Sequence, residues 1–164
     1  MKIRAAVTAT LGVLAFAALV AVGSPTAADG PWIDMERCAA CAPYMAEPGL
    51  MQHAQMESYA IATGMASITT VPAQYETALT RAEAGCNVVF QRAQSGEKVA
   101  LCDMCSDLVD LGEKGAKFDQ LDTKAGHIMA VTATDPALIK KIHTHVERTN
   151  AEMKKMMEKP KASY

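Results

Sequence analysis

The sequence is poor in aromatic residues and has no large excess of charge of either sign. It contains one Trp, four Tyr and three Phe in 164 residues, and its formal net charge is −2 at pH 7. Nucleic-acid-binding domains carry a basic surface, and polybasic membrane contacts need clustered Lys and Arg. We therefore expect no nucleic-acid partner and no electrostatic attachment to a membrane.

Motifs typical of enzymes are also missing. There is no glycine-rich phosphate loop, no serine in a nucleophile elbow and no His-Glu-x-x-His helix. The acidic residues are spread along predicted exposed helix faces rather than paired. We assign no catalytic residue, and the sequence favours a binding protein over an enzyme.

Only one long apolar run is present, and it lies at the N-terminus. Lys2 and Arg4 precede an apolar segment over residues 5–22, and small residues over 23–28 follow it. This order is typical of a secretory signal peptide, with cleavage predicted after Ala28. The alternative is an uncleaved anchor, because the apolar segment is at the lower limit for spanning a bilayer.

Cleavage after Ala28 would leave residues 29–164 as a single exported domain, periplasmic or secreted, with no stable membrane span. Its 136 residues are enough to bury a core without disulfides. Without Lys2 and Arg4, the domain contains 14 basic and 18 acidic residues. The exported domain is therefore expected to be mildly acidic.

The exported part contains an internal similarity. Identical residues recur 64 positions apart, among them Cys38 and Cys102, Cys41 and Cys105, and Pro72 and Pro136. Between these residues the register slips by two, so that Gly64 matches Gly126. Such self-similarity indicates a duplicated unit of about 60 residues, with repeat 1 over about 35–95 and repeat 2 over about 99–158.

Each repeat is predicted to form a helix, a β-hairpin and a second helix. The first helix begins near the cysteine pair and ends at a breaker, Pro48-Gly49 in one repeat and residues 112–115 in the other. Gly at each turn and alternating β-branched residues predict hairpin strands over 54–61 and 65–71, and over 116–122 and 127–133. We expect an α+β fold, with a four-stranded antiparallel sheet, helices packed against it and a pseudo-twofold axis.

The second helix of each repeat is predicted from apolar residues three and four positions apart. Asp135-Pro136 supplies an N-cap and a first helical residue for the later one. Its predicted buried residues are Ile139, Ile142, Val146, Thr149, Met153 and Met156. The corresponding residues of repeat 1 are Leu79, Ala82, Cys86, Val89 and Ala93, before the helix ends at Ser95-Gly96.

The five cysteines are the strongest chemical signal. Cys86 stands alone on a predicted buried helix face, where a thiol behaves as a small apolar side chain. The other four form two C-x-x-C pairs at matching repeat positions: Cys38, Cys41, Cys102 and Cys105.

Three interpretations of the two pairs remain open. Four thiolates from two helix starts could hold one copper or zinc ion, and helix N-termini favour the thiolate form. Each pair, or a cross-pair of one cysteine from each, could instead form a disulfide, as is usual for exported cysteines. Finally, one pair could be redox-active. Residues 99–101, Cys102-x-x-Cys105 and the following helix have the same order as the strand, C-x-x-C motif and helix of thioredoxin-like enzymes, although the repeats lack the remaining strands of that fold.

Histidine and methionine residues form a second candidate ligand set. His127 and Met129 share one face of a predicted strand, and Met65 lies on the matching strand. If the hairpins pair, an imidazole and two thioethers could converge, which suits copper. The simpler interpretation is a polar strand end beside core methionines, which fill irregular gaps. His143 and His145 diverge on a helix, and we predict that this stretch is exposed.

Taken together, these patterns favour a small exported protein that binds copper or zinc through paired cysteines, for sequestration or carriage. A disulfide-bonded interaction or structural module with an unknown protein partner is the main alternative. A thiol-disulfide oxidoreductase is the third.

Overall fold

The computed structural model describes residues 31–158, so the predicted signal peptide lies outside the described residues. The elements in chain order are α1 (Ala42–Met45), α2 (Leu50–His53), β1 (Gln55–Ile61), β2 (Gly64–Thr70), the 3₁₀ turn η1 (Ala73–Tyr75), α3 (Glu76–Gln94), α4 (Asp103–Glu113), β3 (Lys117–Thr123), β4 (Gly126–Thr132) and α5 (Pro136–Glu158). The fold is α+β, as predicted. Within residues 31–158, no helix is both long enough and apolar enough to cross a membrane.

The four strands form one antiparallel sheet in the order β1-β2-β4-β3. Each hairpin contributes one central and one edge strand, and β2 pairs with β4 so that Ile68 lies opposite Ile128. Both hairpins were predicted within one residue of their observed bounds. The helix, hairpin, helix order is also present in both halves, while the duplication itself and its twofold axis stay predictions.

Gly64 and Gly126 allow the central strands to approach each other. Their φ angles are 152° and 145°. A Cβ atom at Gly64 would lie 1.9 Å from the carbonyl oxygen of Val131, and one at Gly126 would lie 1.9 Å from that of Thr69. These glycines are therefore required by both the turn conformation and the β2–β4 contact.

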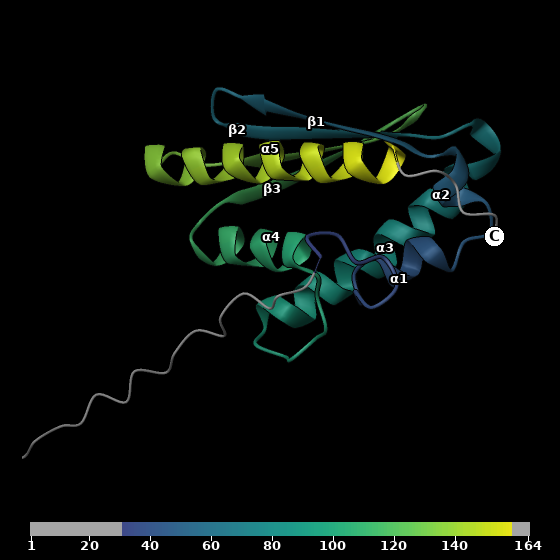
Figure 1. Ribbon diagram of the computed structural model, residues 1–164, viewed down its shortest axis with the longest axis horizontal. Helices are drawn as coiled ribbons and strands as arrows, with labels where there is room; N and C mark the ends of the chain where they lie inside the picture. The colour runs from purple at the N-terminus through teal and green to yellow at the C-terminus, as the bar shows by residue number, and fades with distance from the viewer. Residues whose placement is uncertain (1–30, 159–164) are drawn as a thin grey trace, which may run out of the picture.

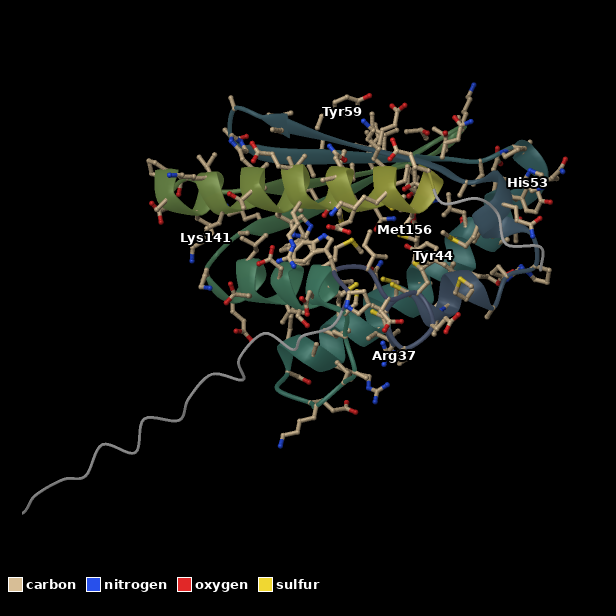
Figure 2. All side chains as sticks on the ribbon, viewed as in Figure 1. Arg37, Tyr44, His53, Tyr59, Lys141 and Met156 are labelled. Atoms are coloured by element: carbon tan, nitrogen blue, oxygen red, sulfur yellow. The ribbon has the colours of Figure 1, made fainter. Side chains whose placement is uncertain are left out.

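The two faces of the sheet differ. Helix α5 packs against one face and also contacts α4, while none of the helices within residues 31–158 covers the opposite face (Figure 1). Tyr59 and Leu121 lie on this open face and are exposed, and Figure 2 shows Tyr59 projecting from it. On the covered face, Met65 and Val131 are register partners and pack in one core with Leu111, Ile142 and Val146.

The predicted buried face of α5 is largely confirmed. Ile142, Val146 and Thr149 are buried, and Ile139 is half-buried. The prediction is wrong for Met156, which is 43% exposed because the last turns of α5 extend past the core. On α3, Leu79, Ala82 and Val89 are buried, whereas Cys86 and Ala93 are half-buried.

The opening helix of the first half was predicted incorrectly. A single helix was expected from the cysteine pair to Pro48-Gly49, but α1 is one turn and α2 is a second turn beyond the breaker. Pro48 cannot continue a helix, and Gly49 adopts a left-handed conformation with φ 75°. In the second half, α4 spans 11 residues and ends before Gly115, as expected.

Replacing Ile142 by Ala should lower the free energy of unfolding by roughly 2–5 kcal/mol, because this side chain has no exposed surface. Chemical denaturation of the full chain measures the change. Val88→Ala is the control, since Val88 is 53% exposed on α3 and its truncation should cost less than about 0.5 kcal/mol. Equal costs would contradict the observed core.

Gly64→Ala should destabilise the protein by more than about 2 kcal/mol, because an added Cβ collides with the Val131 carbonyl. Gly96→Ala is the matched control. Gly96 also has a positive φ, but a Cβ added there would meet no atom within 4 Å. Its substitution should therefore cost only about 1 kcal/mol of backbone strain. Denaturation midpoints that rank the two variants the other way would refute the role given to Gly64.

Candidate metal centre

The four paired cysteines come from two chain segments that are fastened together by backbone hydrogen bonds. The Ala39 amide donates to the Ala100 carbonyl at 2.8 Å, and the Met104 amide donates to the Trp32 carbonyl at 3.0 Å. The first pair lies just before α1 and the second at the start of α4. These two contacts place both pairs at one point in the fold.

Each C-x-x-C sequence forms a tight turn. The amides of Cys41 and Ala42 both donate to the Cys38 carbonyl at 3.0 Å. In the second pair, Cys102 is the N-cap residue of α4 in an extended conformation, and its carbonyl accepts from Ser106 at 2.9 Å. Cys102 and Cys105 lie three residues apart at the start of α4, on one side of that helix, while Cys41 is the N-cap residue of α1.

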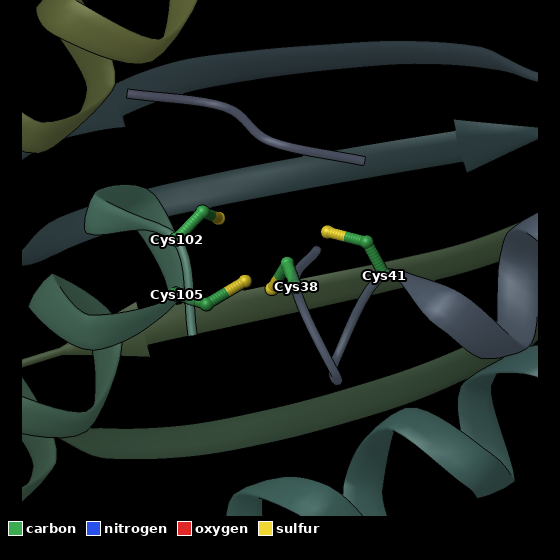
Figure 3. A group of neighbouring side chains, drawn as sticks. All are labelled: Cys38, Cys41, Cys102 and Cys105. Carbon is green, nitrogen blue, oxygen red and sulfur yellow. The ribbon is translucent and has the colours of Figure 1, made fainter. Parts of the chain in front are cut away.

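The four thiols converge in a buried cluster. Their Sγ atoms all lie within 4.8 Å of one another, and Figure 3 shows them directed toward a common centre. Sulfur atoms around a tetrahedral ion with 2.3 Å bonds are about 3.8 Å apart, so small shifts would complete such a site. Each residue is between 1% and 6% exposed: Cys38, Cys41, Cys102 and Cys105.

The two pairs lie in one cluster, as the metal-site interpretation requires. The structure records all five cysteines as free thiols, and none of them is joined in a disulfide. The geometry therefore offers four sulfur ligands from two segments to a single ion.

Hydrogen bonds between the thiols favour thiolates in both pairs. Those bonds lower the pKa of Cys38, with the largest contribution from Cys102. Cys105 donates to Cys102 and lowers the pKa of Cys102 to about 6. The pKa values of Cys41 and Cys105 are raised, mainly by hydrogen bonding to Cys102 and by burial. In each pair, hydrogen bonds from neighbouring thiols thus lower the pKa of one cysteine, which favours the thiolate form that binds metal.

Trp32 secures the segment that carries the first pair. Its indole N–H donates to Thr149 Oγ1 at 3.1 Å. The Arg148 guanidinium lies 3.9 Å from the centroid of the Trp32 ring, a cation–π contact. Trp32 therefore joins the cysteine-bearing segment to α5, while its carbonyl joins it to α4 through Met104. Sequence analysis did not assign it a role.

The prediction that the His143–His145 stretch is exposed was wrong for His145. This residue is 4% exposed, and its Nδ1 lies 2.7 Å from Asp107 Oδ2. It lies on the same helix face as Ile142 and Thr149, three and four residues away, which the periodicity of α5 could have indicated. His143 diverges from it, as predicted, and its Nε2 lies 2.9 Å from the Ile61 carbonyl oxygen.

The second candidate ligand set lies on the covered face of the sheet. Met65, Met129 and His127 all line one cavity of about 460 Å³ between the sheet and the helices. The ring of His127 is held by carboxylates, with Nδ1 2.8 Å from Asp122 Oδ1 and 3.0 Å from Glu83 Oε2. The pKa of Glu83 is raised by burial. The structure thus brings the three residues to one cavity, and their role as ligands stays a prediction.

Cys86 lies beside the four-cysteine cluster without belonging to it. It packs against the apolar residues around the cluster and lines the same cavity as Met65. Burial is the main cause that raises the pKa of Cys86 to about 12. This thiol is therefore protonated at neutral pH, in keeping with the packing role predicted for it.

Comparison of the chain with protein-family models, with curated proteins and with solved structures found no match.

Proposed function

We propose that this protein binds one copper or zinc ion through four cysteine thiolates and serves to sequester or carry that ion outside the cytoplasm. The observation that carries the proposal is the cluster of four buried Sγ atoms within 4.8 Å of one another. The ligands are Cys38, Cys41, Cys102 and Cys105.

Convergence of all four thiols favours a metal over disulfides. A disulfide within each C-x-x-C pair would need only local geometry, and a cross-pair disulfide would need only two thiols to meet, whereas here all four Sγ atoms lie within 4.8 Å of one another. Four close thiols cost free energy through buried polarity, and a bound cation offsets that cost by neutralising the thiolates. Four sulfur ligands in a tetrahedron are typical of zinc, and thiolates also select copper(I).

The closed ligand set favours holding an ion over catalysis. A catalytic zinc site keeps one coordination position for water or substrate, whereas four protein ligands leave none. Burial of all four cysteines also limits exchange with solvent. Storage or transport of the ion fits these properties better than chemistry on a substrate.

Export and duplication belong to the same proposal. The predicted signal peptide sends the chain to an oxidising compartment, where a bound metal would protect the thiols from oxidation. Each repeat would supply one C-x-x-C pair, so duplication of a two-thiol unit would have created a four-thiol site. Pairing of β2 with β4 at the centre of the sheet supports this origin.

Metal content and thermal stability test the proposal. The full chain, expressed with export, should contain one metal ion per molecule, and a chelator should remove it and lower the melting temperature. An ion present at 1,000 times its dissociation constant stabilises the fold by about 4 kcal/mol. Cys38→Ser and Cys102→Ser should each weaken binding to a similar extent.

Cys86→Ser is the matched control, because it makes the same chemical change beside the cluster and should leave the metal content unchanged. Equal loss of metal in Cys86→Ser would contradict the assigned ligands.

Intact mass separates the metal site from the disulfide alternative. After unfolding in chelator, all four cluster thiols should react with an alkylating reagent. A mass deficit of two hydrogens per bridge, with no bound metal, would establish the disulfide-bonded module instead.

A further inference from the structure

The cavity beneath the sheet has an unusual lining. It measures about 460 Å³ and is bounded by the covered face of the sheet, by helices α3, α4 and α5, and by the segment around the first cysteine pair. Figure 2 shows sulfur atoms gathered between the sheet and helices α1 and α3. Three cysteines line it, Cys41, Cys86 and Cys105. The thioethers that line it are those of Met35, Met51, Met56, Met65, Met104, Met129 and Met153.

Methionine is concentrated here far beyond its share of the chain. The chain has eleven methionines, and Met1 and Met157 have no described side chains. Seven of the remaining nine line this cavity, and the exceptions are Met45 and Met156. Met65 and Met129 also pack against the apolar core, so these side chains border both the core and the open space of the cavity.

The strand register brings two of these thioethers within reach of each other. Met65 lies opposite Val131, and Met129 lies two residues from Val131 on the same strand and face. Such diagonal neighbours are about 7–8 Å apart at the backbone, which long side chains can bridge. Met65 is 2% exposed and Met56 is 44% exposed, so the lining runs from a buried interior to the surface.

We propose that this cavity is a second metal site, a thioether site for a soft monovalent cation, copper(I). Thioethers are soft, uncharged ligands that favour copper(I) over zinc. Three rotatable bonds in each methionine let the sulfur atoms close around an ion, and the open volume gives them room to move. Among the described residues that line the cavity there is no Lys or Arg, whereas Glu83 and Asp119 are present.

This site is continuous with the four-cysteine centre, because Cys41 and Cys105 belong to both. An ion held by thioethers can therefore pass to thiolates without entering bulk water. Transfer to the cysteines rests on the proposed function, while binding by the thioethers does not.

Silver(I), a redox-inert substitute for copper(I), tests the site in the full chain labelled with ¹³C at the methionine methyl groups. Silver binds the thiols first. Further silver should shift the methyl signals of the cavity methionines in a saturable manner and leave those of Met45 and Met156 in place.

A Met65→Leu/Met129→Leu double variant should weaken this second phase at least about tenfold, because leucine keeps the volume and removes the sulfur. Met45→Leu/Met156→Leu is the matched control and should bind silver as the unaltered chain does. Zinc content, measured on the same variants, should remain at one ion per molecule.

Absence of shifts at the cavity methionines after the thiols are saturated would overturn the thioether site. Equal shifts at Met45 and Met156 would overturn it as well. Saturable binding of 1-anilinonaphthalene-8-sulfonate that silver does not displace would assign the cavity to apolar molecules instead. Absence of both zinc and copper from the four cysteines, with the silver shifts of the cavity methionines retained, would contradict the four-cysteine proposal and leave the thioether site standing.

Discussion

The fold depends on the junction between the segment before α1 and the segment before α4. Two backbone hydrogen bonds, from Ala39 to Ala100 and from Met104 to Trp32, hold this junction together. They bring four thiols into one cluster, and Trp32 ties the same junction to α5. The cysteines themselves are four of the six buried residues in the apolar cluster at this junction, and the other two are Ala40 and Val89. A metal ion bound there would link both halves of the chain, so that metal binding and folding would be one process.

The sheet and the cysteine cluster each connect the two halves of the chain. The central β2–β4 contact, made possible by Gly64 and Gly126, joins the two hairpins from one side. On the other side, the cysteine junction joins the segment before α1 to the segment before α4. Between them lies the methionine-lined cavity, which neither side fills. A protein built only for stability would close such a space, because an unfilled cavity forfeits packing energy. Seven methionines and three cysteines line this space, which is the basis of the proposed thioether site.

Local signals account for what could be predicted from sequence. Turn glycines and β-branched residues located both hairpins, and Asp135-Pro136 located the start of α5. The opening helix was misjudged because Pro43, tolerated in a first turn, and Pro48, a breaker, lie too close for a longer helix. The burial of His145 follows from its position on the helix face of Ile142 and Thr149, whereas its contact with Asp107, 38 residues away, could not be predicted from a local pattern. Convergence of the cysteine pairs and the position of the cavity depend on strand order and long-range contacts, which no local pattern encodes.

X-ray absorption at the metal edge of the purified, exported protein tests the central claim most directly. Four sulfur neighbours at about 2.3 Å from a zinc ion, with no nitrogen or oxygen neighbour, are the predicted result. If copper(I) is bound, the first shell should again consist of sulfur alone. A first shell of nitrogen and oxygen, or no bound metal in a protein whose cysteines are paired as disulfides, would contradict the account.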